Sequence, residues 1–331
     1  MKIAIAGGIF DEPAHYQDII TTPETNLVSG LQARGVETVA VGLHARVPRG
    51  VDLLHVHHIG PIAVRALVLR IPVVLTRHRH PGVVSAGRRG RLAQMALLQR
   101  CDALVALTDF EASYYRSRLR DCTIRVIPNG INSDIFSPDP LVPPQPEVLF
   151  VGQLSHSKGV FDLIGSFSGL ASRYPDLRLR LVSHVQPDRE EFLAAVAARG
   201  LTSRVTVEEG MNHHELASRY QRALVFVLPS LPSHGEALPS VTAEAALTGT
   251  PVVCTEIPGV REQLGDLATY VPPGSPRLLE EALHQAIEGQ AQERRRLGAA
   301  RPALLAKLSV DQMVEQHLDL YAELTGRGGT P

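Results

Sequence analysis

The sequence contains few of the residues on which several protein classes depend. Only three of its 331 residues are cysteines, and Cys101, Cys122 and Cys254 lie far apart without a CxxC pair. Three scattered thiols supply neither a disulfide framework nor the four ligands of a zinc ribbon, so a reducing, cytoplasmic setting fits best. Uncharged apolar runs of 18 residues are absent, and the opening MKIAIAGG is shorter than the hydrophobic segment of a signal peptide. We therefore expect a cytoplasmic protein, either soluble or peripheral to the inner face of the membrane.

Acidic residues are missing from one long stretch of the chain. Between Asp52 and Asp102 there are eight arginines and no aspartate or glutamate, although the net charge of the whole chain is −1. Two interpretations remain open for residues 53–101: ordinary solvated arginines, or a positive face that contacts an anionic acceptor or a lipid surface. We expect no nucleic-acid partner.

Length and composition predict a folded chain of two domains. Hydrophobic residues make up 44% and charged residues 20% of the 331 positions, which is ordinary globular composition. Short β-branched runs alternate with amphipathic stretches, the pattern of successive βα units and parallel sheets. The sequence therefore predicts an α/β protein with two doubly wound Rossmann-like domains that face a central cleft.

The predicted boundaries follow a proline-rich break. Five prolines in the eleven residues SPDPLVPPQPE exclude a helix interior or a central strand there. We expect an N-terminal domain at 1–137, a linker at 138–147, a C-terminal domain at 148–308, and a helix with a frayed tail at 309–331. That last helix has an apolar stripe with Ser309 and Gln312 as a capping box, and crossing back to the N-terminal domain is left open. The other expected helices lie at 23–34, 61–70, 86–100, 110–119, 158–172, 188–199, 213–221, 239–248 and 276–288.

The segment SHGEALPSVTAEAALTGTPVV contains two glutamates eight residues apart. Between Glu236 and Glu256 the only carboxylate is Glu244, which lies among alanine, valine and leucine. Pro239 suits the first position of a helix and Gly249 its far end, so free backbone N–H groups should lie between the paired glutamates. A helix N-terminus binds phosphate, and flanking carboxylates are tolerated where hydroxyl groups donate to them. This arrangement fits a nucleotide sugar; the alternative is a pair of ordinary surface glutamates.

A lysine lies at the start of another predicted helix. The segment FVGQLSHSKGVFDLI indicates a strand, a polar loop and a helix that begins near Ser157 or Lys158. A lysine there opposes the helix dipole unless an anion lies between its ammonium group and the helix N–H groups. The chain has 30 arginines and only three lysines. Lys158 is therefore a candidate anion ligand, with a generic exposed charge as the alternative.

These segments occur in an order that resembles a known family. IPNGIN followed by Phe136, then FVGQLSHSKG, EALPSVTAEAALTGTPVV, and IPGVREQLGD before VPPG are similar to glycosyltransferase family 4, the retaining enzymes of GT-B fold. The similarity runs from MKIAIAGG to at least residue 290 and is looser in the N-terminal domain. It implies an N-terminal acceptor-binding domain and a C-terminal nucleotide-sugar-binding domain.

The resemblance implies a role for each matching residue. It places Lys158 on the donor diphosphate, Glu236 on the donor sugar hydroxyls and Glu244 on the ribose hydroxyls. His78 in LTRH matches the histidine beside the transferred sugar, so Lys158, Glu236 and His78 are the candidate catalytic residues. Further donor contacts are implied for Gly8, Gln153, Gly210, Met211, Leu238, Pro239 and Ser240.

Two features concern which groups neutralise the negative charge of the diphosphate. Gln153 stands where similar enzymes carry an arginine that shares the diphosphate with the lysine, so one positive charge is missing. No Asp-x-Asp pair occurs, which predicts activity without a metal ion. Five histidines could suggest zinc, at positions 55, 57, 58, 78 and 80. Because strand alternation separates neighbouring side chains, we expect structural or acceptor-side roles for them and no metal site.

The expected activity is therefore retaining glycosyl transfer, and a hexosyl group is the expected transferred group. The UDP or GDP sugar is a substrate and no cofactor is expected; its leaving phosphate assists same-face displacement by an acceptor hydroxyl. The acceptor is a small molecule or a lipid-linked group. Two alternatives remain: a sugar-nucleotide epimerase of the same architecture, and a non-catalytic subunit that binds a nucleotide sugar.

Overall fold

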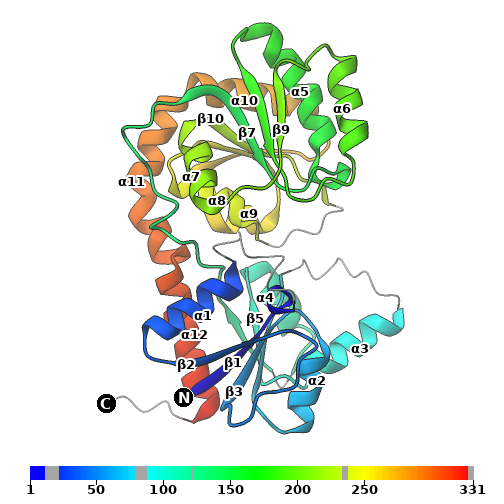
Figure 1. The fold of residues 1–331 in the computed structure, drawn as a ribbon, viewed down its shortest axis with the longest axis vertical. Helices are drawn as coiled ribbons and strands as arrows, with labels where there is room; N and C mark the ends of the chain where they lie inside the picture. The colour runs from blue at the N-terminus through cyan, green and yellow to red at the C-terminus, as the bar shows by residue number, and fades with distance from the viewer. Residues whose placement is uncertain (12–21, 79–87, 121, 233–237, 327–331) are drawn as a thin grey trace. The chain divides into compact units, whose positions relative to one another are not determined.

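The chain divides into two units, each an α/β layered structure. A computed structural model, drawn in Figure 1, describes residues 1–11, 22–78, 88–120, 122–232 and 238–326. The first unit comprises Met1–Asn132 and Ala306–Pro331, with Leu238 assigned to it as well. The second comprises Ser133–His234 and Pro239–Leu305. The predicted fold class of two doubly wound Rossmann-like units is confirmed.

The first unit is built on a six-stranded parallel sheet of order β2-β1-β3-β4-β5-β6. Alternation along β1 separates its two faces, because Ile3 and Ile5 join one hydrophobic core and Ala4 and Ala6 join the other. Between β1 and β3 the strand order reverses direction, which is the position where doubly wound sheets bind ligands. The strands are β1 (Lys2–Ala6), β2 (Glu37–Val41), β3 (Leu53–His57), β4 (Val73–Thr76), β5 (Ala103–Ala106) and β6 (Thr123–Val126).

Helices cover both faces of this sheet. Helices α1 and α12 supply the core of one face, and α2, α3 and α4 that of the other. Helix α12, from the far end of the chain, packs closely on α1, because a Cβ on Gly30 would overlap the Val314 side chain. At its start, Ser309 Oγ accepts from Gln312 N at 3.2 Å, which is one half of the predicted capping box. The helices are α1 (Pro23–Ala33), α2 (Pro61–Val68), α3 (Arg88–Leu98), α4 (Asp109–Arg116), α12 (Val310–Thr325) and the short η1 (Gly8–Phe10).

The second unit carries another six-stranded parallel sheet, of order β12-β11-β10-β7-β8-β9. Counted from its first strand this is the 3-2-1-4-5-6 order of dinucleotide-binding folds, with the reversal between β7 and β10. The strands are β7 (Gln145–Val151), β8 (Arg178–Val182), β9 (Val205–Glu208), β10 (Ala223–Leu228), β11 (Val252–Thr255) and β12 (Ala268–Val271). Its helices are η3 (His156–Lys158), α5 (Val160–Arg173), α6 (Arg189–Ala198), α7 (His213–Arg222), α8 (Ser240–Leu247), α9 (Pro258–Leu264), η5 (Gly265–Leu267), α10 (Pro276–Glu288) and α11 (Gln290–Leu308).

The proline-rich segment differs from expectation at its end. Residues 138–147 were expected as linker, yet β7 begins at Gln145 and includes Pro146, although it is a central strand. The pairing with β10 jumps from Gln145 opposite Ala223 to Val148 opposite Val225, which is a β-bulge. The bulge removes the need for a ladder N–H at the proline, so a central strand tolerates it here.

One long helix was not expected from the sequence. Helix α11 contains Gly298 and Pro302 and lacks a continuous apolar stripe, so neither its periodicity nor its composition predicts a helix.

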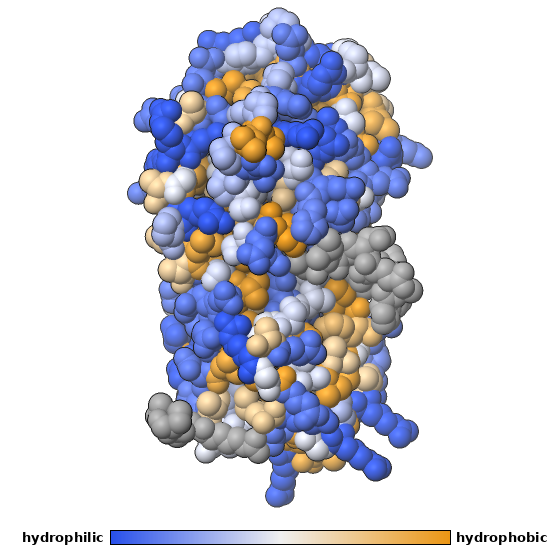
Figure 2. All heavy atoms as spheres, turned by 60° about the vertical axis from the view of Figure 1, so that its left-hand side comes forward, coloured by the Kyte–Doolittle hydropathy of each residue, from blue (hydrophilic) through white to orange (hydrophobic). Residues whose placement is uncertain are grey.

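Hydrophilic residues predominate on the face drawn in Figure 2, and hydrophobic ones form small separate groups. Among the residues that the structure describes, no helix is both long and apolar enough to cross a membrane.

Candidate active site

The carboxyl edge of the second sheet brings two loops together at its reversal point. One loop follows β7 and leads through η3 to α5, and the other follows β10 and leads towards α8. Leu231 N in the second loop donates a hydrogen bond to Ser157 O in the first, at 2.8 Å. Because ligands of open parallel sheets bind beyond the strands at this position, these loops form the candidate donor site.

Lys158 lies at the centre of the first loop. It is the last residue of η3 and is buried, with a relative exposure of 7%. Gly159 follows with φ +70°, and a Cβ there would overlap the carbonyl oxygen of Pro229, so only glycine lets the loop approach the end of β10 this closely. A Cβ built on Gly152 would lie 3.8 Å from Cε of Lys158, which places the lysine stem beside the first residue after β7. The lysine therefore comes just before α5, as the sequence indicated.

Glu244 lies in α8 and is buried. The helix begins at Ser240, and Pro239 is its N-cap rather than its predicted first residue, because Pro239 has extended backbone angles. The hydroxyl of Tyr220, from α7, donates to Glu244 Oε2 at 3.0 Å. Burial raises the pKa of Glu244 to about 7, and the Tyr220 hydrogen bond opposes part of that rise. Glu244 is therefore an acceptor whose charge changes near neutral pH.

The other residues predicted to contact the nucleotide sugar lie around these two loops and after β9. Gln153 is exposed directly after Gly152, and Leu238 is buried just before α8. Gly210 and Met211 follow β9, and a Cβ on Gly210 would overlap the ring of His184. Met211 lines a surface pocket of about 460 Å³ together with Glu208, Glu209, Glu215, Ser218, Arg219 and Arg222. Glu236 lies outside the described residues.

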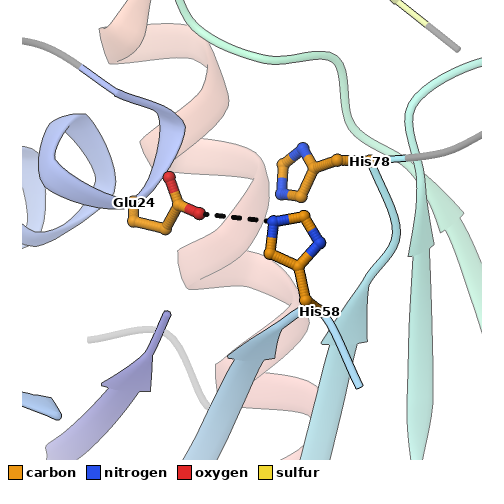
Figure 3. Close-up of side chains that lie close together, drawn as sticks. All are labelled: Glu24, His58 and His78. Atoms are coloured by element: carbon orange, nitrogen blue, oxygen red, sulfur yellow. Dashed lines mark ion pairs between the residues drawn. The ribbon is translucent and has the colours of Figure 1, made fainter. Parts of the chain in front are cut away.

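The carboxyl edge of the first sheet carries the other predicted residues and one that was missed. Gly8 begins η1 two residues beyond β1, and His78 lies two residues beyond β4. His58, the residue after β3, points towards His78 and towards Glu24 in the first turn of α1, as Figure 3 shows. His58 Nε2 lies 3.9 Å from Glu24 Oε1. Sequence reasoning missed Glu24, because an acidic residue in the first turn of a helix is common.

A histidine chain runs inward from this edge. His57 Nδ1 and His78 Nε2 form a hydrogen bond of 3.0 Å. The next buried histidine along β3, His55, bonds the Tyr321 hydroxyl at 2.6 Å and the Thr76 hydroxyl at 2.7 Å. Burial lowers the pKa of His78 to about 3, with the charge of His58 adding to the shift. The buried rings are therefore neutral hydrogen-bonding groups at physiological pH.

The expectation that strand alternation separates these histidines needs correction at one position. His55 and His57 both belong to β3 and both are buried, but His58 lies beyond the strand with φ +80°. This left-handed conformation ends the alternation of the strand. His58 consequently joins His78 instead of facing away from it, with ring centroids 4.9 Å apart.

Two family descriptions match the chain. "Glycosyl transferases group 1" matches residues 133–302, and "Glycosyltransferase Family 4" matches residues 42–135. The D-inositol 3-phosphate glycosyltransferase of Nocardiopsis dassonvillei is 30% identical over 319 residues, 86% of this chain and 73% of that protein. The glycogen synthase of Mycobacterium tuberculosis is 29% identical and covers 76% of this chain, which spans 64% of that protein.

Solved structures share the fold over the whole chain. Sucrose-phosphate synthase from Thermosynechococcus elongatus superposes with a TM-score of 0.83 at 21% identity, covering 99% of this chain and 100% of its own. HepE from Anabaena, in complex with UDP and glucose, gives a TM-score of 0.75 at 18% identity, covering 98% and 100%. These likenesses confirm the predicted GT-B architecture, and the family matches confirm the resemblance drawn from the motifs.

Proposed function

The chain belongs to the group 1 glycosyl transferases, and we propose that it is a retaining enzyme that moves a hexosyl group from a nucleoside-diphosphate sugar to an acceptor hydroxyl. The observation that carries this proposal is the burial of Lys158, just before α5, in a loop that is hydrogen-bonded to the loop after β10. A lysine at a helix start is favourable when an anion lies between its ammonium group and the helix N–H groups. A diphosphate supplies that anion.

The proposed chemistry uses the charge that develops on the leaving group. As the bond from the sugar to the diphosphate lengthens, the sugar acquires oxocarbenium character and the phosphate oxygens gain negative charge. Lys158 and the free N–H groups at the starts of α5 and α8 stabilise that charge without a metal ion. A phosphate oxygen takes the acceptor proton on the face from which the leaving group departs, and retention follows.

The other site residues take positioning and binding roles in this proposal. Glu244 accepts hydrogen bonds from the ribose hydroxyls, and Glu236 from the hydroxyls of the transferred sugar. His78, a neutral imidazole, lies beside that sugar, and Gly8 lets the backbone approach the donor phosphate. Further donor contacts come from Gln153, Gly210, Met211, Leu238, Pro239 and Ser240.

The relatives support only the chemical classes of the proposed substrates. UDP, bound by the HepE structure, is one candidate leaving group, and GDP is the other. The name of the Nocardiopsis relative supports a small polar acceptor, anionic if it carries a phosphate. No cofactor takes part in this scheme.

A lipid-linked acceptor is the second acceptor class, and one surface favours it. In α2, within the arginine-rich stretch 53–101, Val64 and Val68 are exposed, Val68 by 77%. Leu69 follows and is exposed as well. Apolar side chains among arginines suit peripheral contact with an anionic membrane surface, so binding to anionic but not neutral vesicles is expected.

Donor incubation without acceptor tests the proposed activity. Nucleoside diphosphates are first screened by thermal shift, since a ligand that binds the folded state raises the melting temperature. Sugar donors of the base selected in that screen are then incubated with the protein. Slow release of nucleoside diphosphate and free sugar supports the transferase. Sugar isomerisation would instead identify an epimerase, and binding without either reaction a non-catalytic subunit.

A further inference from the structure

Three potential metal ligands converge at the carboxyl edge of the first sheet. Glu24, His58 and His78 each present one ligand atom, and these atoms all lie within 4.8 Å of one another. Figure 3 shows the two imidazole rings and the carboxylate turned towards a common point. The residues come from the start of α1 and from the ends of β3 and β4. The site thus lies beside the strand-order reversal between β1 and β3, where doubly wound sheets bind ligands.

Local backbone features shape the positions of His58 and Glu24. His58 has φ +80°, a conformation that costs a non-glycine residue energy and is concentrated at functional sites. A Cβ on Gly7 would lie only 3.0 Å from Cγ of Glu24, so the glycine makes room for the glutamate. His78 Nε2 forms a 3.0 Å hydrogen bond with His57 Nδ1, and a metal ion bound at that nitrogen would take the place of this contact.

We propose that Glu24, His58 and His78 form a binding site for a divalent transition-metal ion such as zinc. Two imidazoles and one carboxylate are a ligand set that zinc accepts, with a fourth position left for water or another oxygen ligand. The site contains none of the proposed diphosphate contacts around Lys158, but it shares His78 with the proposed contact to the transferred sugar.

The spacing favours a bridging ion over a direct ion pair. Charge-assisted hydrogen bonds join N and O atoms at about 2.7–2.9 Å, whereas His58 Nε2 and Glu24 Oε1 are 3.9 Å apart. Two ligands that each lie about 2.0–2.1 Å from a tetrahedral zinc ion are roughly 3.4 Å from one another. The three ligand atoms lie within 4.8 Å of one another, so each side of the triangle has to shorten by at most about 1.4 Å to bind the ion.

Metal titration of the purified protein tests the site without any nucleotide sugar, so its outcome is independent of the proposed function. Protein stripped with chelator and dialysed is titrated with Zn²⁺ against a chromogenic competitor, and with Co²⁺ while the visible spectrum is recorded. We expect one tight equivalent of zinc and the absorption bands of cobalt bound in a low-symmetry N/O site. Zinc should also raise the melting temperature.

Variants connect the binding to these residues. Glu24→Gln keeps the shape of the side chain, and His58→Asn keeps a residue that tolerates positive φ. Each should weaken zinc binding at least about tenfold and abolish the zinc-induced rise in melting temperature. His44→Asn, at an exposed histidine of the same unit, is the control and should bind like the wild type. Absence of a tight equivalent in the wild type, or unchanged affinity in folded Glu24→Gln and His58→Asn, would overturn the proposal.

Discussion

The two sheets present opposite chemistry at equivalent edges. Beyond β7 and β10 of the second sheet lies a buried lysine among helix starts, an environment for an anion. Beyond β3 and β4 of the first lie imidazoles and one carboxylate, an environment for a cation or for neutral hydroxyl groups. The parallel fold fixes where each site lies, whereas a few side chains decide what each binds.

Burial acts on both edges in the same way, with opposite consequences for pKa. It disfavours charge, so it raises the pKa of Glu244 to about 7 and lowers that of His78 to about 3. Near neutral pH, Glu244 is therefore part protonated and His78 is fully neutral. The Glu244 carboxyl therefore changes its charge in the physiological pH range, and the His78 imidazole does not.

The largest expected effect comes from removing one positive charge from the loop after β7, compared with removing one from the first unit. Lys158→Ala should raise the barrier of donor hydrolysis by about 2–4 kcal/mol, roughly 30- to 900-fold in rate, because in the proposed mechanism the lysine acts on charge that accumulates in the transition state. Lys2→Ala removes the same charge from the first unit, where Lys2 pairs with Glu37, and should leave the rate unchanged. Steady-state hydrolysis kinetics and a melting curve measure both variants. Full activity in a folded Lys158→Ala protein would remove the lysine from the mechanism.

The second effect is a pH dependence confined to the second unit. In the proposed donor site, ribose hydroxyls donate to the ionised form of Glu244, so we expect only the deprotonated fraction of the free protein to bind well. With a pKa of about 7, that fraction and the affinity for a nucleoside diphosphate should rise about tenfold from pH 6 to pH 8.

Calorimetric titrations across that range provide the measurement. Glu244→Gln should bind more weakly at pH 8 and should lose the share of the pH dependence that Glu244 contributes. His78→Gln is the matched comparison from the first unit, and should keep the wild-type pH profile because His78 is neutral throughout the range. An identical profile in wild type and Glu244→Gln would show that Glu244 does not face the ribose.

Much of the fold was readable from the sequence, and the exceptions have local causes. Helices with a clear apolar period, such as α5 and α10, lie within two residues of their predicted ranges. Helix α11 was missed because Gly298 and Pro302 interrupt its period. The start of β7 was misread because a β-bulge, which is a property of the pairing with β10, admits Pro146.

The two sites differ in how much the sequence could reveal. Lys158 and Glu244 stand out because a charge breaks an otherwise apolar or polar-neutral pattern. Glu24 and His58 do not, since one looks like an ordinary helix-start residue and the other like the continuation of a strand. Only the positive φ of His58 and the meeting of three separate segments bring them together, and neither is encoded in local sequence pattern.

A smaller effect is expected from adding charge to the second site. Gln153 is neutral, and Arg261 in α9 is held by Glu256 at 3.0 Å and over the ring of Tyr270. Gln153→Arg should therefore supply a missing charge-assisted contact and tighten nucleoside diphosphate binding by about five- to tenfold. Gln32→Arg, an equal charge at an exposed position of α1 in the first unit, should leave the affinity unchanged. A gain in both variants that disappears at high salt would indicate general attraction rather than a contact at position 153.

The smallest expected effect is that of a chelator on donor hydrolysis, and it sharpens the contrast between the two units. The proposed diphosphate site relies on Lys158 and helix N–H groups, so EDTA should change the hydrolysis rate less than about twofold. The first unit should respond differently, because the same treatment removes any ion from Glu24, His58 and His78.

Hydrolysis without acceptor and transfer with acceptor are therefore measured on one chelated sample, before and after zinc is restored. Loss of hydrolysis that returns with manganese would mean that a metal ion, not Lys158, carries the diphosphate charge. Unchanged hydrolysis with transfer that falls and recovers with zinc would instead place the metal on the acceptor side, in keeping with the separate chemistry of the two edges.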